Sequence, residues 1–159
     1  MSSKLIDRTD RRLLELLQTD GRLSNIDLAE RVALSASPCL RRVRALEESG
    51  VIRQYVALLD PGRVGLGLLA FVNVKLEKRG SMPVAEFAQA VQAWPEVVAC
   101  YSMTGDMDYL LRVHVEDLDH YSRFVMDKVL KQPAVIDVKS NFVLERIKDT
   151  TALPLSHLG

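Results

Sequence analysis

The stretch from Ser24 to Gly50 most constrains the fold, because it holds two short helical patterns joined by a tight turn. Ser24 followed three residues later by Asp27 resembles a capping box, which starts a helix. The second helix can begin at Ser35 or Ser37, and Pro38 then falls in its first turn, where a missing N–H costs little. Two short helices with a three-residue turn predict a helix-turn-helix unit.

The second of these helices carries several arginines within one turn. With Leu40, Val43 and Leu46 turned inward, helical spacing leaves a basic and mostly slim outer face. A helix of that kind can enter the major groove of double-stranded DNA. A solvated helical surface is the alternative interpretation, and the helix-turn-helix frame favours DNA. The candidate DNA-binding residues are Ser35, Ser37, Pro38, Arg41, Arg42 and Arg44.

Different contacts are expected from these side chains. Arg41 and Arg44 are predicted to bind phosphates and so to position the helix. Arg42, together with Ser37, is predicted to lie near base edges.

The residues on either side extend this unit. Apolar residues between Ile6 and Leu17 recur with helical spacing, and Asp7 is a plausible cap for this supporting helix. Val51 to Leu59 is rich in strand formers and predicts a strand that leaves the helices. We therefore expect a winged helix-turn-helix domain at 1–59 and a glycine-containing hinge at 60–67.

The pattern changes after the hinge, and residues 68–159 are expected to form a second domain. Its elements follow the order β-α-β-β-α-β, which is the ferredoxin-like plan and gives an α+β protein. In that plan two helices cover one face of the sheet, and the bare face needs a partner, so we expect a homodimer. The expected elements are strands at 68–76, 97–103, 108–115 and 134–147 and helices at 84–93 and 118–131.

Composition excludes several classes of protein. Among the 159 residues, the formal net charge is zero, and no run approaches a membrane span of roughly 18 apolar residues. Cys39 and Cys100 lack metal or redox spacing, which fits a reducing cytoplasm. No catalytic or phosphate-loop constellation appears, and the acidic run between Asp106 and Asp119 is better explained as a solvated rim than as a metal site.

Two separate motifs, in order, then give a resemblance that covers nearly the whole chain. The first is IDRTDRRLLELLQTDGRLSNIDLAERVALSASPCLRRVRALEESGVI, and the second is MTGDMDYLLRVHV, followed by TTALPL. The chain resembles the leucine-responsive regulator and asparagine-synthetase regulator (Lrp/AsnC, feast/famine) family of transcription factors. The resemblance implies DNA binding, an amino-acid effector, and dimers that assemble into octamers in the cytoplasm, associated with the nucleoid. It implies no cofactor.

By the same resemblance, the loop Thr104 to Asp108 binds the effector. Gly105 permits a tight turn whose N–H groups can face an α-carboxylate, and Asp106 or Asp108 can pair with an α-ammonium group. A polar hairpin turn is the alternative interpretation. The candidate effector-binding residues are Met103, Thr104, Gly105, Asp106, Asp108, Tyr109, Val138, Ser140 and Asn141.

The chain also departs from its family. Ala33 stands where many members have glycine, which strains the turn by about 0.5 to 1 kcal/mol if that position needs a positive φ. The last strand does not identify the ligand. The apolar Met103 and Met107 favour a leucine- or methionine-type amino acid.

Two other functions remain open from sequence. An architectural protein that organises the nucleoid with little sequence preference would use the same residues. A small amino-acid-binding enzyme would leave the arginines of the N-terminal half without a role and lacks a nucleophile.

Overall fold

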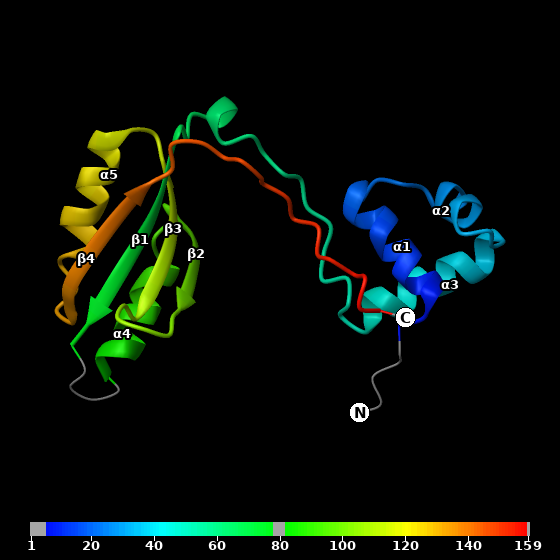
Figure 1. Cartoon of the computed structure of the whole chain (residues 1–159), viewed down its shortest axis with the longest axis horizontal. Coiled ribbons are helices and arrows are strands. Elements are labelled where there is room, and N and C mark those ends of the chain that lie inside the picture. Colours follow the sequence, from blue (N-terminus) through cyan, green and yellow to red (C-terminus); the bar gives the residue numbers. More distant parts are fainter. Residues whose placement is uncertain (1–5, 78–81, 159) are drawn as a thin grey trace. The chain divides into compact units, whose positions relative to one another are not determined.

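The structure, a computed structural model, describes residues 6–77 and 82–158. The chain divides into two compact units, which are shown in Figure 1. One unit combines Met1–Ala57 with Lys148–Gly159, and the other is Leu58–Ile147. We call them the recognition unit and the regulatory unit. The chain therefore passes from one unit to the other twice.

Three helices form the recognition unit: α1 (Arg8–Thr19), α2 (Asn25–Arg31) and α3 (Ala36–Glu48). Asp7 caps α1 and Ser24 caps α2, each through a reciprocal capping box, as the sequence predicted. The helices pack around a small core that includes Leu13, Leu28 and Cys39. The predicted helix-turn-helix is therefore present.

The inward face of α3 differs from the prediction by one residue. Cys39, Val43 and Leu46 are buried, whereas Leu40 is 38% exposed. Cys39 is itself one of the most frequently buried residue types, and with Val43 and Leu46 it forms an i, i+4, i+7 stripe. The whole helix is therefore rotated relative to the expected orientation, and this changes which arginines point outward.

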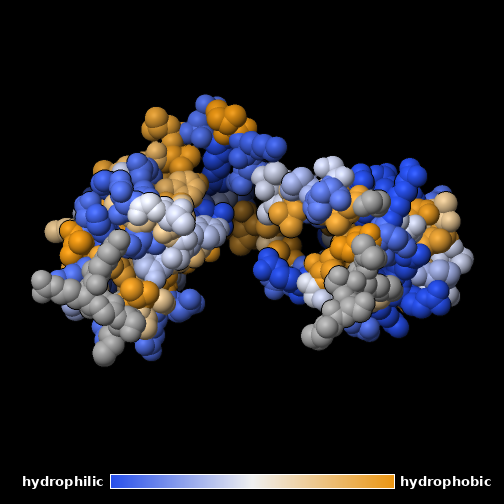
Figure 2. All heavy atoms as spheres, turned by 60° about the horizontal axis from the view of Figure 1, so that its bottom comes forward, coloured by the Kyte–Doolittle hydropathy of each residue, from blue (hydrophilic) through white to orange (hydrophobic). Residues whose placement is uncertain are grey.

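The predicted strand at Val51–Leu59 is absent. Residues 51–60 form neither a strand nor a helix. A strand needs a second strand to receive its backbone hydrogen bonds, and none of the described residues pairs with this segment. Its side chains are mostly exposed, among them Tyr55, Val56 and Leu58. Figure 2 shows hydrophobic residues at several places on the molecular surface.

Residues 148–158 do not continue the regulatory unit, where the sequence analysis had placed them. They lie on α1 instead. The Gln18 side chain donates to the Leu153 carbonyl at 3.2 Å and accepts from the Leu153 N–H at 2.6 Å. Arg11 Nη1 donates to the Leu158 carbonyl at 2.9 Å. These backbone contacts explain why the segment groups with the recognition unit.

The regulatory unit has the predicted β-α-β-β-α-β order. After a short 3₁₀ turn, η1 (Gly62–Val64), come β1 (Leu68–Leu76), α4 (Met82–Gln92), β2 (Val97–Ser102), β3 (Tyr109–Val115), α5 (Leu118–Phe124) and β4 (Val135–Phe142). A π-helical segment, η2 (Val125–Val129), continues α5. The strands pair antiparallel in the order β2-β3-β1-β4. This is the ferredoxin-like arrangement, and the α+β class is confirmed.

The core of this unit lies on one face of the sheet. Alternate residues of β1, from Ala70 to Leu76, are buried and cluster with Phe87 of α4 and Phe124 of α5. The intervening residues of β1 are only half-buried. Register places Leu69, Phe71, Leu110 and Tyr101 on that second face. The second face is therefore partly apolar and, within the described chain, lacks a covering helix.

Length and hydropathy together decide whether a helix can cross a membrane. Among residues 6–77 and 82–158, no helix combines the length and the hydropathy that crossing a membrane requires.

Candidate DNA-binding and effector sites

The outward face of α3 carries most of the predicted DNA-binding residues. Ser35, Ser37, Arg41 and Arg44 are exposed, and Pro38 is half-buried beside them. Arg44 lies on this outer face, opposite the buried stripe of Cys39, Val43 and Leu46. We call the four exposed residues the recognition face.

The N-terminal end of α3 is open to an anion. Within the fully described first turn, Ser35 forms no side-chain cap bond, and there is no acidic residue. Unsatisfied N–H groups and the helix dipole together favour a phosphate at such an end. Asn25 Nδ2 donates to the Ala36 carbonyl at 2.8 Å and thereby ties the start of α2 to the start of α3. Asn25 was not predicted to have a role.

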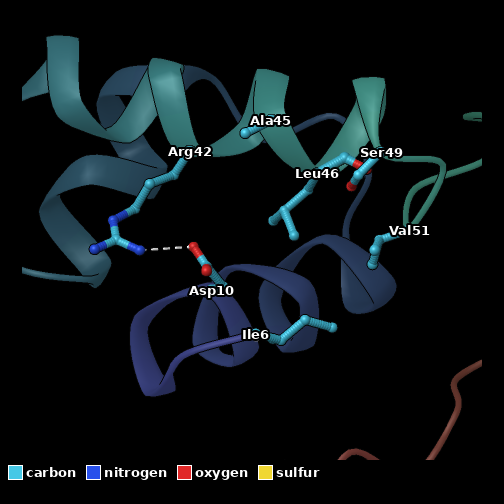
Figure 3. Close-up of a pocket in the computed structure, with 7 residues that line it drawn as sticks. All are labelled: Ile6, Asp10, Arg42, Ala45, Leu46, Ser49 and Val51. Carbon is cyan, nitrogen blue, oxygen red and sulfur yellow. Dashed lines mark hydrogen bonds and ion pairs between the residues drawn. The ribbon is translucent and has the colours of Figure 1, made fainter. Parts of the chain in front are cut away.

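Arg42 does not belong to the recognition face, and this corrects the prediction that it lies near base edges. Figure 3 shows its side chain reaching from α3 towards Asp10 of α1. Arg42 Nη1 donates to Asp10 Oδ1 at 2.8 Å and to Asp7 Oδ2 at 2.7 Å. The physical reason is the burial of Asp10, which is 5% exposed and needs a cation close by.

The pKa values of this group reflect the same contacts. The Asp10 N–H bonded to its carboxylate, and then the Arg42 guanidinium, lower the pKa of Asp7 below its ordinary value despite partial desolvation. Hydrogen bonds to Asp10 and Asp7 raise the pKa of Arg42. These contacts therefore favour the charged forms of Asp7 and Arg42.

The predicted effector loop connects β2 to β3. The Met103 N–H donates to the Asp108 carbonyl at 2.9 Å and closes the loop. Gly105 has φ 109°, a conformation that side chains with a Cβ rarely adopt. Thr104, Gly105 and Asp106 are exposed. The exposed loop presents backbone N–H groups and one carboxylate to the surroundings.

Register brings part of the predicted effector set together. Val74 of β1 pairs with Tyr109 of β3 on one side and with Val138 of β4 on the other. Tyr109 and Val138 both pack against the helix-covered core, and the rings of Tyr109 and Phe87 are 5.1 Å apart. The loop and the first half of β4 therefore lie at the same end of the sheet, on either side of β1.

Ser140 and Asn141 are placed differently from each other. The Tyr121 hydroxyl donates to Ser140 Oγ, so Ser140 points to the helix-covered face. Asn141 Nδ2 donates to the Phe71 carbonyl at 3.4 Å, and its strand position is opposite Phe71 on the uncovered face. The structure separates these two residues, although sequence reasoning grouped them.

No metal site accompanies this loop. Among the residues that the structure describes, no cluster of three or more His, Cys, Asp or Glu side chains could hold an ion.

Comparison with known families finds a match for each half of the chain. Residues 6–53 match the winged helix-turn-helix DNA-binding model, and residues 69–153 match the Lrp/AsnC ligand binding domain. The chain belongs to the Lrp/AsnC family. It is a DNA-binding transcriptional regulator with an amino-acid-binding domain, and this family is not one of enzymes.

Relatives of this Lrp/AsnC protein match over almost their whole length. It is 44% identical to the DNA-binding transcriptional activator DecR of Escherichia coli, over 95% of this chain and 99% of the relative. The leucine-responsive regulatory protein of Escherichia coli is 41% identical, over 94% and 92%.

Solved structures agree as well. A transcriptional regulator of Neisseria meningitidis in complex with L-Met has a TM-score of 0.93 and 50% identity, and covers 96% of this chain and 98% of that one. An AsnC family regulator from Agrobacterium tumefaciens has a TM-score of 0.89 at 45% identity, with 94% and 97% covered.

Three residues with roles in these sites were missed by sequence reasoning. Asp10 and Asn25 position α3, and Tyr121 holds Ser140. Asp10 could have been found, because an acidic residue adjacent to the apolar stripe of an amphipathic helix needs a cation nearby. Asn25 and Tyr121 act through contacts that depend on the fold, and no local pattern signals them.

Proposed function

We propose that this regulator responds to methionine, or to an amino acid with a similarly long apolar side chain, which binds at the loop Met103–Asp108. Support comes from the Neisseria meningitidis regulator, which is 50% identical and was solved with L-Met. The loop adds a physical reason, since Gly105 lets backbone N–H groups approach a carboxylate and Asp106 is exposed for an ammonium group.

Around this loop, Thr104 and Met103 are proposed to line the ligand, and Tyr109 and Val138 to form the adjoining apolar wall. Ser140 contributes through its bond to Tyr121, and Asn141 from the opposite sheet face contributes only where a second subunit completes the site. Asp108 is proposed to hold the loop in shape, because its carboxylate accepts a backbone hydrogen bond from Leu76.

DNA binding is proposed to use the recognition face of α3. Arg41 and Arg44 contact phosphates, while Ser35 and Ser37, with Pro38 beside them, bring the open helix end close to the DNA. One recognition unit offers few contacts, so useful affinity requires two units spaced about one helical turn apart. We propose that the uncovered sheet face pairs two chains into a homodimer, and that dimers assemble further into octamers, working at the nucleoid in the cytoplasm.

A thermal-shift screen of the twenty amino acids tests the effector. Methionine is expected to raise the melting temperature most, because a ligand stabilises the folded state by RT ln(1 + [L]/Kd). Gly105→Val and Asp106→Ala are expected to abolish this shift and to leave DNA binding intact. Arg41→Ala serves as the matched control that keeps the shift and weakens DNA binding. Normal shifts in both loop variants would place the ligand elsewhere.

Competition between a selected DNA site and random DNA at fixed salt tests sequence specificity. A regulator is expected to prefer its site by about 10³-fold or more. A ratio near one would instead support an architectural role in the nucleoid.

A further inference from the structure

Arg42 joins two helices through a single nitrogen atom. Its Nη1 lies 2.7 Å from Asp7 Oδ2 and 2.8 Å from Asp10 Oδ1. The side chain of Arg42 is 32% exposed and that of Asp10 is 8% exposed. One cation therefore bridges two carboxylates at the boundary between α1 and α3, as Figure 3 shows for Asp10.

Both carboxylates also cap α1, and they do so with their other oxygens. Asp7 Oδ1 accepts from the Asp10 N–H at 2.8 Å, and Asp10 Oδ2 accepts from the Asp7 N–H at 3.4 Å. The four oxygens are thus divided between the first turn of α1 and the middle of α3. The start of α1 therefore fixes the position of Arg42 on α3.

Apolar packing next to this point leaves a gap. A small crevice remains between α1 and α3, lined by Ile6, Asp10, Arg42, Ala45 and Leu46. The α3 side chains at the contact include Cys39 and Ala45, which are too small to interlock deeply with a facing helix. Cys39, Val43 and Leu46 set which face of α3 turns inward, and the bonds of Arg42 add a second restraint on the rotation of the helix.

The charge of Arg42 is already matched. Two carboxylates lie against one guanidinium, so this group presents no net positive charge to a phosphate. Arg41 and Arg44 are exposed and, by contrast, point outward. Arg42 therefore binds carboxylates within the protein, whereas Arg41 and Arg44 are accessible to DNA.

We infer that Arg42 is a positioning residue, which holds α3 at the rotation that aims Ser37, Arg41 and Arg44 at DNA, and that it does not itself contact DNA. This inference rests on the proposed use of the recognition face. It assigns specificity partly to Asp7 and Asp10, which lie on a helix outside the helix-turn-helix.

The test uses the full chain and a duplex that the wild-type protein selects from a random-sequence pool. Affinity for that duplex and for random DNA is measured over a range of salt concentrations. The variants are Arg42→Ala, Arg42→Lys, Asp10→Asn and Asp7→Asn, with Arg41→Ala as the matched control. Thermal unfolding followed by circular dichroism shows that each variant is folded at the measuring temperature.

Arg42→Ala and Asp10→Asn are expected to lose about tenfold or more in affinity for the selected duplex, the scale of one lost base contact. Binding to random DNA and the salt slope should stay near wild type, because the long side chains of Arg41 and Arg44 still reach phosphates after a small rotation of α3, whereas the short Ser37 loses its position. Arg42→Lys should retain most of the affinity, because one ammonium group can occupy the position of Nη1. Arg41→Ala should instead lower the salt slope by about 0.9, as expected for one lost phosphate contact.

The Asp10→Asn variant distinguishes a positioning role of Arg42 from direct contact with DNA, because the two roles predict different changes in DNA affinity. If Arg42 read DNA, releasing it from Asp10 would leave affinity unchanged or raise it, and that result overturns the inference. A salt slope lowered in Arg42→Ala as in Arg41→Ala also overturns it. If Asp10→Asn does not fold, Asp7→Asn gives the same comparison at a half-exposed carboxylate. A wild-type protein that selects no duplex overturns the proposed function itself, whereas a binding wild type with an indifferent Asp10→Asn overturns only this inference.

Discussion

The Asp108 carboxylate accepts a hydrogen bond from the backbone N–H of Leu76 at 2.8 Å. Leu76 lies at the end of β1, where the register to β4 shifts, and it is 2% exposed. The Asp108 N–H also donates to the Val74 carbonyl at 3.0 Å. One residue of the loop Met103–Asp108 is therefore hydrogen-bonded to β1, and the two aspartates of the loop have different environments.

Replacing these two aspartates should separate structure from ligand binding. Asp108→Ala leaves a buried N–H without its acceptor and should destabilise the regulatory unit by about 1 to 3 kcal/mol. Asp106→Ala should change stability by less than about 0.5 kcal/mol, because Asp106 is exposed. Urea unfolding without ligand measures both, and Asp108→Asn, which keeps an acceptor oxygen, should fall between them. Equal losses in Asp106→Ala and Asp108→Ala would refute the distinction.

Ala33 is the only non-glycine residue with a positive φ in the described chain, at 54°. The strain expected from sequence is therefore present in the turn between α2 and α3. Ala33→Gly should stabilise the recognition unit by up to about 1 kcal/mol, since glycine adopts this conformation without a Cβ clash. Calorimetry should show a melting temperature higher by a few degrees. Ala45→Gly, inside α3, is a control that should lower it.

The contacts of residues 148–158 predict that the recognition unit is less stable when these residues are removed. A chain ending at Ile147 loses the partners of Gln18 and Arg11 on α1, so its recognition unit should unfold at a lower temperature. Gln18→Ala should cost about 0.5 to 1.5 kcal/mol, the net contribution of a hydrogen bond. Methionine should still shift the transition of the regulatory unit. Thr19→Ala, one residue along the same helix, is the matched control for Gln18→Ala.

An ion pair in the regulatory unit predicts a dependence of stability on pH. Lys128 Nζ donates to both Glu96 oxygens, at 2.6 and 2.8 Å, and His120 Nε2 lies 3.7 Å from Oε1. Although burial acts to raise the pKa of Glu96, the bonds from Lys128 leave it below its ordinary value of 4.5. A lowered folded-state pKa stabilises the fold above the ordinary value and loses this effect as pH falls through the folded value.

Glu96→Gln should therefore be less stable than wild type by about 1 to 2 kcal/mol at neutral pH, as expected for a charge-assisted hydrogen bond. The difference should shrink as the pH falls below 4.5, because wild-type Glu96 becomes neutral. Urea unfolding across this pH range measures the gap. Glu86→Gln, at an exposed position on α4, should show no comparable gap, and a constant gap for Glu96→Gln would contradict the explanation.

Local sequence patterns were sufficient to predict elements that depend on nearby residues or on the regular spacing of apolar residues. The bounds of β1 and the caps at Asp7 and Ser24 follow from alternation and capping chemistry, and the element order gave the ferredoxin-like plan. The strand at Val51–Leu59 failed for a different reason: its composition suits a strand, but a strand exists only with a partner. Composition does not reveal whether one chain supplies that partner.

The candidate sites were predictable in outline and not in detail. The position of the loop and the basic helix could be identified from sequence, whereas the role of Arg42 could not. Whether an arginine on a helix faces DNA or a neighbouring carboxylate depends on a rotation of tens of degrees. That rotation was set here by Cys39, a residue that is only weakly apolar, and by a carboxylate on another helix.

The second passage of the chain between the two units has a consequence during protein synthesis. Residues 148–158, which bind Gln18 and Arg11, leave the ribosome only after the whole regulatory unit has been made. The three helices can form early, but their contacts with residues 148–158 form only after the regulatory unit has been translated. A nascent chain that has not reached these residues therefore carries a less stable recognition unit.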